Sequence, residues 1–304
     1  MARTRTTREA AEAIGFAADW LLRALAGEVA GDARHYMRAD GHVDDGNAQL
    51  SRWRPARFQN GTVLAMDEIT TAVDGQTLTV AINRPAKRNA LTTAMYRELG
   101  TVLRQAEEAR VVVLAGAGGA FSAGNDLGDF LDDFKANDAV REFQEAVLDT
   151  KAVLVAAVDG PAVGIGATVL LHCDLVYATE RSYLQFPFVN IGLVPEFGSS
   201  LLLTQRIGRH RAAELLLFGD RVPARKAQEL GLVNEVLDDA EALEARLKDR
   251  VAALLAKPER SLEQTRKLVH DTIHAHDQMV RESQVFGELL DDPDTKARIQ
   301  AMRR

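Results

Sequence analysis

Two glycine-rich loops, residues 116–124 and 160–166, have the residue types and spacing best suited to chemistry. Each follows an apolar run, 111–115 or 153–158, that predicts a buried strand. Glycine lets a backbone N–H approach a ligand closely because it has no Cβ. The second loop precedes an apolar run, 167–173, that predicts a buried helix, and the first N–H groups of a helix lack intrahelical partners. Two converging N–H donors would form an oxyanion hole, although such loops are also common as purely structural turns.

The first loop does not fit a nucleotide-binding motif. Gly116 and Gly118 match the first two glycines of a dinucleotide-binding fingerprint, but Phe121 stands where the third glycine is needed. A phosphate-binding loop would need a Gly-Lys-Ser/Thr sequence, which does not follow. We therefore expect this loop to bring backbone N–H groups close to a ligand other than a nucleotide phosphate.

The hydrophobic pattern around these loops predicts alternating strands and helices. Residues 69–73 and 76–82 form a predicted hairpin, because Asp74-Gly75 supplies the positive φ angles of a tight turn. Further strands are expected at 174–178, 182–185 and 233–236, and helices at 92–109, 138–149, 199–207, 209–218, 224–230, 239–256, 258–275 and 278–290. This alternation predicts an α/β core with a helical C-terminal region.

Composition narrows the classes of partner. The chain has 304 residues and a net charge of -7, which argues against nucleic acid because no basic surplus exists to neutralise phosphates. Cys173 is the single cysteine, so we expect no internal disulfide and a reducing compartment. The sequence shows no apolar run long enough to span a bilayer and no signal-peptide pattern, so we expect a cytoplasmic protein without membrane contacts.

Five motifs, in order, resemble the crotonase superfamily of enoyl-CoA hydratases and isomerases. Three match its hallmark segments, and two match the strand after the family's central helix and its later helical pattern. The motifs are RPAKRNAL (84–91), FSAGNDL (121–127), GPAVGIG (160–166), CDLVYA (173–178) and LFGD (217–220). The resemblance covers residues 67–304. We expect an N-terminal extension at 1–65, whose role stays open, a core at 66–256 and a C-terminal helical region at 257–304.

The resemblance implies a crotonase-type fold, a spiral of ββα units whose C-terminal helices support assembly as a homotrimer or hexamer. It implies an acyl-CoA thioester substrate from fatty acid metabolism, with coenzyme A as part of the substrate, no separate cofactor and no metal. By position, the backbone N–H groups of Ala123 and Ile165 would be the two oxyanion donors. The remaining substrate-binding positions that it implies are Ala86, Lys87 and Arg88 along the coenzyme A, then Gly124, Asn125, Asp126, Gly164 and Phe188. Lys87 or Arg88 would lie near the phosphates, and Asp126 would position its loop or lie near the substrate.

The acid/base positions favour one branch of the family. Hydratases hold a water between two glutamates, and the matching positions here are Thr168 and Phe188. Glu196, in LVPEFGSS (193–200), matches the single catalytic base of the Δ3,Δ2-enoyl-CoA isomerases. One carboxylate can take a proton from C2 and return it to C4, and apolar neighbours such as Phe197 would raise its pKa. Glu196 could instead be an acid that caps the next helix.

The sequence therefore predicts an enoyl-CoA isomerase that converts a 3-enoyl-CoA to 2-trans-enoyl-CoA. Its catalytic groups would be Glu196 as base and the N–H groups of Ala123 and Ile165 as oxyanion donors. Two alternatives stay open: an enoyl-CoA hydratase or other crotonase-type acyl-CoA enzyme, and a non-catalytic acyl-CoA-binding protein.

Overall fold

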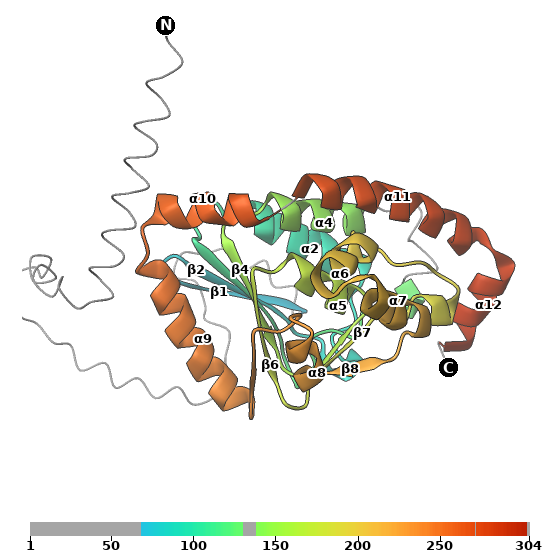
Figure 1. The fold of residues 1–304 in the computed structure, drawn as a ribbon, viewed down its shortest axis with the longest axis horizontal. Coiled ribbons are helices and arrows are strands. Elements are labelled where there is room, and N and C mark those ends of the chain that lie inside the picture. Colours follow the sequence, from blue (N-terminus) through green and yellow to red (C-terminus); the bar gives the residue numbers. More distant parts are fainter. Residues whose placement is uncertain (1–67, 130–137, 271, 303–304) are drawn as a thin grey trace, which may run out of the picture. The chain divides into compact units, whose positions relative to one another are not determined.

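The computed structural model describes residues 68–129, 138–270 and 272–302 (Figure 1). The expected N-terminal extension, residues 1–65, lies outside these ranges.

A six-stranded sheet forms the centre of the described part, with strand order β1-β2-β3-β4-β6-β9. The expected hairpin is confirmed: β1 pairs antiparallel with β2, and Gly75 in the turn has φ 55°. The pairs from β2 to β9 are all parallel. The strands are β1 (Ile69–Asp74), β2 (Thr77–Ile82), β3 (Val111–Gly116), β4 (Val153–Val158), β6 (Leu175–Thr179) and β9 (Glu235–Leu237). The expected α/β class is therefore confirmed.

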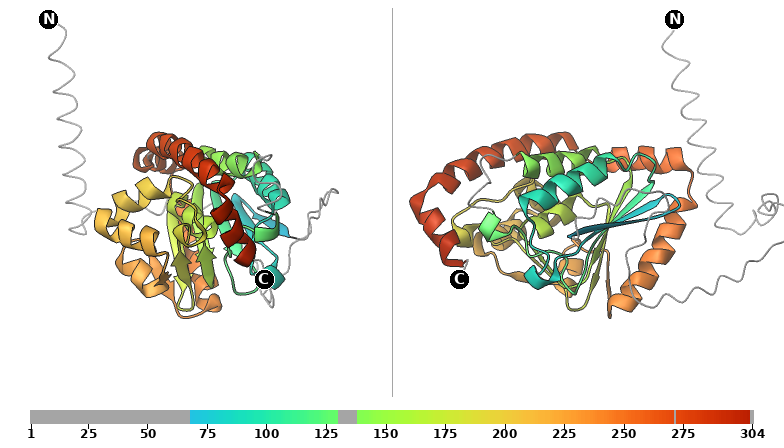
Figure 2. Two further views of the ribbon diagram at one scale, coloured as in Figure 1. Left: turned by 90° about the vertical axis from the view of Figure 1, so that its right-hand side faces the viewer. Right: turned by 180° about the vertical axis from the view of Figure 1, so that it is seen from behind.

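Helices cover the two faces of this sheet because successive strand residues point to opposite sides. In β4, Leu154 belongs to the main apolar core, whereas Val153 and Val155 belong to a second core beneath α9 (Ala240–Leu255). Helices α2 (Thr93–Arg104) and α4 (Ala139–Asp149) pack against each other over the main core, and Figure 2 shows α9 on the opposite side of the sheet. Each face of the sheet is thereby buried.

A second, three-stranded sheet holds the turn after β4. Its order is β5-β7-β8, with β5 at Pro161–Val163, β7 at Tyr183–Gln185 and β8 at Arg221–Pro223. Of these strands the sequence predicted only β7. It missed β5 and β8, because three residues are too few to show a clear period of two. Through β5, this sheet fixes the start of the helix that follows the glycine turn.

The helix expected at 167–173 begins two residues earlier, ends one residue earlier and is only partly α-helical. One turn of α-helix, α5 (Ile165–Thr168), continues as a 3₁₀ segment, η3 (Val169–His172). The expected helices at 199–207, 209–218 and 224–230 are confirmed as α6 (Ser199–Ile207), α7 (Arg209–Phe218) and α8 (Ala224–Glu229).

The C-terminal helices differ from the expected division. The helix expected at 258–275 ends as α10 (Glu259–Val269), because His270 has extended backbone, with φ -95° and ψ 109°. The next helix, α11 (Thr272–Asp291), includes the helix expected at 278–290. A final helix, α12 (Pro293–Met302), was not expected. The long α11 packs on α6 and thereby reaches the loop that carries Glu196.

Candidate active site

The two glycine loops meet, as the sequence predicted. The Pro161 carbonyl accepts hydrogen bonds from the N–H groups of Phe121 and Ser122, both at 3.0 Å, and the Val163 N–H donates to the Ser122 carbonyl at 2.9 Å. A Cβ on Gly166 would lie 2.8 Å from the Ser122 Cβ, so only glycine allows this approach. The loop after β3 is therefore packed directly on the first turn of α5.

The two expected oxyanion donors are in different situations. Ile165 is buried at the start of α5, and its N–H makes no hydrogen bond to any residue that the structure describes. The Ala123 N–H donates to the Arg88 carbonyl at 2.9 Å. Gly164, which precedes Ile165, has φ 56° and donates its N–H to the Gln185 carbonyl of β7 at 3.0 Å. Ala123 would therefore have to exchange the Arg88 carbonyl for a substrate oxygen.

Asn89 is a buried residue that holds the first loop in place. Its side-chain oxygen accepts from the Arg84 N–H at 2.8 Å, and its Nδ2 donates to the carbonyls of Ala117 at 2.9 Å and Ala120 at 2.6 Å. The Ser122 hydroxyl donates to the Asn89 carbonyl at 2.9 Å. The segment expected to contact coenzyme A and the loop expected to supply an oxyanion donor are thus one hydrogen-bonded unit.

Asp126 ties its loop to the same unit. Its carboxylate forms a 2.6 Å ion pair with Arg84 and accepts from the Gly128 N–H at 2.9 Å. Partial burial raises the pKa of Asp126, but the bonds from Arg84 and the backbone outweigh it and hold this pKa below its usual range. Its neighbour Asn125 accepts a short hydrogen bond from the buried Tyr96 hydroxyl. These contacts fit a positioning role for Asp126.

Glu196 lies in the loop before α6, and two side chains bind its carboxyl group. The Gln144 Nε2 of α4 donates to Oε2 at 2.7 Å, and the Thr168 hydroxyl of α5 donates to Oε1 at 2.5 Å. By the family resemblance, Thr168 occupies the position where a hydratase would carry one of its two glutamates. The residue keeps some exposed surface, but its carboxyl group is surrounded by protein atoms.

This environment raises the pKa of Glu196 to about 8. Burial is the main cause, because it disfavours the charged form. The hydrogen bonds from Thr168 and Gln144 lower the pKa, whereas the nearby carboxylate of Glu282 raises it. A carboxyl group with this pKa can exchange protons near neutral pH, as a general base must.

The backbone on the C-terminal side of Glu196 is also fixed. Phe197 is buried with φ 59°, a conformation that is costly for a bulky residue. The His172 Nε2 donates to its carbonyl at 2.7 Å, and the two rings stack with centroids 3.9 Å apart. Burial lowers the pKa of His172 to about 3, so its ring stays neutral. On α11, Glu282 accepts from the Gly198 N–H at 2.6 Å.

Sequence reasoning identified Glu196 but missed the residues that hold it. His172 is buried in the apolar run after the glycine turn, and the sequence did not indicate its bond to Phe197. Gln144 is a polar residue on the buried face of the amphipathic helix α4, next to Phe143, and that position was a signal that could have been found. Nothing in the sequence pattern indicated that Glu282 contacts this loop.

The other expected binding residues are separate from the base. Ala86, Lys87 and Arg88 lie exposed in and after the 3₁₀ turn η1 (Pro85–Lys87), and the side chains of Lys87 and Arg88 form no ion pair with a described residue. Phe188 is buried in the main core. Two exposed cationic side chains therefore lie at the segment that the resemblance places along coenzyme A.

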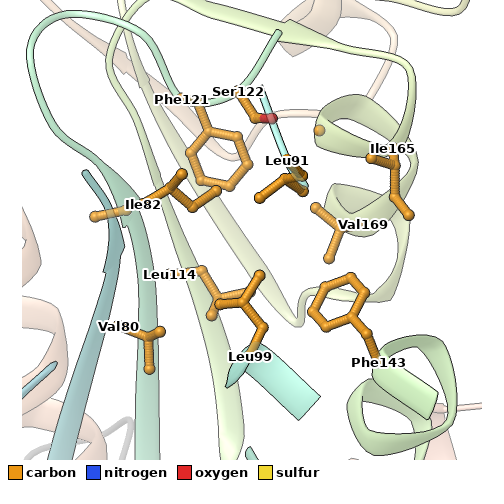
Figure 3. Close-up of a pocket in the computed structure, with 12 residues that line it drawn as sticks. Val80, Ile82, Leu91, Leu99, Leu114, Phe121, Ser122, Phe143, Ile165 and Val169 are labelled. Carbon is orange, nitrogen blue, oxygen red and sulfur yellow. The ribbon is translucent and has the colours of Figure 1, made fainter. Parts of the chain in front are cut away.

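A cavity of about 20 Å³, room for roughly one water molecule, lies in the apolar core behind the turn that carries Ile165. In Figure 3 the side chains of Phe121, Leu99 and Phe143 converge toward Ile165 and Val169. The full lining is Val80, Ile82, Leu91, Leu99, Leu114, Ala115, Phe121, Ser122, Phe143, Ile165, Gly166 and Val169. Glu196 is not part of this lining. Within the described ranges, no three histidine, cysteine or acidic side chains come close enough to hold a metal ion, and no helix is long and apolar enough to cross a membrane.

Comparisons with known proteins agree with this arrangement. The family model for enoyl-CoA hydratase/isomerase matches residues 74–303. The chain is 35% identical over 211 residues to enoyl-CoA delta isomerase 2 of Rattus norvegicus, which covers 66% of this chain and 54% of the relative. It is 32% identical over 230 residues to a probable enoyl-CoA hydratase of Rhodobacter capsulatus, covering 73% of this chain and 89% of the relative.

A solved structure gives the same result for the fold. Pseudomonas aeruginosa OdaA superimposes with a TM-score of 0.75 at 34% identity, covering 78% of this chain and 98% of that one. The chain spans little more than half of the length of the rat isomerase, so the parts of that relative outside the match have no counterpart in the comparison.

Proposed function

Because the chain belongs to the enoyl-CoA hydratase/isomerase family, we propose that it is an enoyl-CoA isomerase that converts a 3-enoyl-CoA to 2-trans-enoyl-CoA. One observation carries the proposal. Glu196 has a raised pKa and is held by Thr168, which occupies one of the positions where a hydratase has a glutamate, while the other position holds the buried Phe188. A single base suits a proton shift, whereas water addition by the usual route needs two carboxylates.

The reaction uses no water and no oxidant. The ionised carboxylate of Glu196 takes a proton from C2, and the electron pair moves into a dienolate whose charge collects on the thioester oxygen. The N–H groups of Ala123 and Ile165 stabilise that oxygen, and removing one such donor typically costs about 10²–10³ in rate. Glu196 then returns the proton to C4, which leaves the double bond between C2 and C3.

The segment around η1 is the proposed contact with coenzyme A. Lys87 and Arg88 are exposed, form no ion pair with a described residue, and would pair with its phosphates. The loop that donates the Ala123 N–H is hydrogen-bonded to this segment through Asn89, so coenzyme A binding and thioester binding share one structural unit.

The test is incubation with a 3-enoyl-CoA, followed by the absorbance of the conjugated 2-enoyl thioester. Glu196→Gln should lower kcat by about 10²–10⁴, because it removes the general base. Its Kd for a saturated acyl-CoA should stay close to that of the unchanged protein. Glu214→Gln, on the exposed surface of α7, is the matched control and should change neither value. A Glu196→Gln protein with full activity would sink the proposal.

Hydration is the second candidate, since the Rhodobacter capsulatus relative at 32% identity is described as a probable hydratase. The same assay distinguishes the two functions when 2-enoyl-CoA is supplied and loss of its absorbance is followed. Fast hydration with slow isomerisation would favour the hydratase. Binding of acyl-CoA without either reaction would indicate a non-catalytic protein.

The proposal extends to assembly as a homotrimer or hexamer. Leu217 and Phe218, adjacent at the end of α7, are 67% and 65% exposed, and a second copy of the chain would cover them at such an interface. The mass of the protein in solution tests this part. A cytoplasmic location stays a prediction.

A further inference from the structure

We infer that Gln144 and Thr168 are positioning residues, which hold the carboxylate of Glu196 from two separate elements and keep it ionisable. The inference deepens the proposed function and rests on it for the role of Glu196. It assigns two residues outside the motifs to the acid/base step.

Gln144 fixes one carboxyl oxygen. Its Nε2 donates to Oε2 of Glu196 at 2.7 Å, and an amide nitrogen can only donate. The residue is 6% exposed, so losing this bond would leave a buried polar group without its partner. The bond therefore favours the ionised form of Glu196 and fixes the plane of its carboxyl group.

Thr168 binds the other carboxyl oxygen, and its hydroxyl can donate or accept according to whether Glu196 is charged or protonated. Its hydroxyl lies 2.5 Å from Oε1 of Glu196 and 3.4 Å from the Ile165 carbonyl. The hydroxyl can donate only one hydrogen bond, and it donates this bond to Glu196 when the carboxylate is charged. When Glu196 carries the proton, the hydroxyl can instead donate to the Ile165 carbonyl and accept a hydrogen bond from the protonated Glu196. A valine of the same shape would do neither.

Few other charged or titratable groups face Glu196. Glu282 of α11 raises its pKa, and Glu196 in turn raises the pKa of Tyr96 of α2, for which burial is the larger cause. His172, against Phe197, is neutral because burial lowers its pKa. No described cation is paired with Glu196, so the donors from Gln144 and Thr168 are its main source of charge stabilisation.

The experiment measures the pKa of Glu196 directly, by NMR of the protein carrying ¹³C-labelled glutamate, with Glu196→Gln to assign the signal. Thr168→Val and Gln144→Met should each raise this pKa by about one unit or more, since a hydrogen bond to a charged group contributes about 1.5–3 kcal/mol. Thr168→Ser keeps the hydroxyl and should restore the original value.

Thr150→Val is the matched control. The Thr150 hydroxyl is also buried and donates to the Ala146 carbonyl at 2.7 Å, within the end of α4 and away from Glu196. Its loss should leave the pKa of Glu196 unchanged. In the isomerase assay, Thr168→Val and Gln144→Met should lower kcat about tenfold at neutral pH with little change in KM, and recover at higher pH.

An unchanged pKa in Thr168→Val or Gln144→Met would overturn the role of that residue, and an equal shift in Thr150→Val would overturn both. The two proposals fail separately. If the pKa values shift as expected but the unchanged protein does not isomerise, the proposed function is wrong and the positioning holds. If the protein isomerises and no pKa shifts, only the positioning is wrong.

Discussion

The two sides of the candidate site are built from different parts of the polypeptide. The oxyanion side is backbone: two loops, which carry Ala123 and Ile165, touch where the Ser122 carbonyl meets the Val163 N–H. The base side is made of side chains, because Glu196 is held by groups from α4 and α5. The placement of the backbone donors depends on close contacts that only glycine allows, as at Gly166. The placement of Glu196 depends on buried polar side chains that form hydrogen bonds to it.

The two sides also differ in the hydrogen bonds that their groups already make before a substrate binds. Both carboxyl oxygens of Glu196 already have their donors. On the other side, the Ala123 N–H is engaged by the Arg88 carbonyl, while the Ile165 N–H is free of described partners. In the proposed reaction, Glu196 would therefore need only a change of protonation, whereas the Ala123 N–H would have to exchange one hydrogen bond when a thioester binds. Substitutions on the two sides should accordingly have different signatures.

The largest effect is expected at Gly166. In Gly166→Ala the new Cβ would lie 2.8 Å from the Ser122 Cβ and 2.9 Å from the Ser122 carbonyl oxygen, so the two loops must separate. We expect kcat to fall about 10²–10³-fold, as when an oxyanion donor is lost. The pKa of Glu196, measured by NMR, should not move.

Gly287→Ala is the control for that substitution, because nothing lies within 4 Å of a Cβ at this position of α11. It should leave kcat unchanged. If Gly166→Ala kept full activity, the contact between the loops would not be what aligns the donors.

The pH dependence should come from the base side. Glu196 must be ionised to accept a proton, and its pKa is raised to about 8, chiefly by burial. We therefore expect kcat/KM to rise roughly tenfold per pH unit below this value and to level off above it. A profile measured with a 3-enoyl-CoA checks this. A profile that falls with increasing pH through this range would contradict the assignment of Glu196 as base.

A smaller effect is expected from Glu282. Its carboxylate raises the pKa of Glu196, so Glu282→Gln should lower that pKa and shift the kcat/KM profile to lower pH. The resulting gain in activity near neutral pH should be a few-fold.

Ser200→Ala is the matched control, because it removes a hydroxyl that donates to Glu282 but keeps the charge. It should not shift the profile to lower pH. An equal downward shift in both variants would show that loop geometry, not charge, sets the pKa of Glu196.

The smallest effect is on stability. Because the pKa of Glu196 is raised on folding, its stabilising protonation is complete below its unfolded value of 4.5 and is lost as pH rises through about 8. Glu196→Gln cannot lose it, so this variant should melt a few degrees above the unchanged protein at alkaline pH. The difference in melting temperature between the two proteins should largely vanish near pH 5. A Glu196→Gln variant that is less stable at both pH values would argue against a raised pKa of Glu196 in the folded protein.

Much of this molecule was predictable from local pattern. The β1-β2 hairpin followed from Asp74-Gly75, and helix α2 from its apolar periodicity, although α2 ends at Arg104 rather than near 109. The crotonase-type fold expected from the motifs is confirmed by the family match and the solved relative. The small sheet of β5, β7 and β8 was mostly missed because its strands have three residues each.

The sequence alone determined the family, the two glycine loops and the candidate base, because each depends on residues that are close together in the chain. The surroundings of Glu196 were decided only by tertiary structure. Gln144 lies 52 positions before it and Thr168 lies 28 before it, while Glu282 of α11 lies 84 positions after Gly198, whose N–H it binds. A carboxyl group's pKa depends on what burial places within hydrogen-bonding distance of it, and no local pattern specifies that.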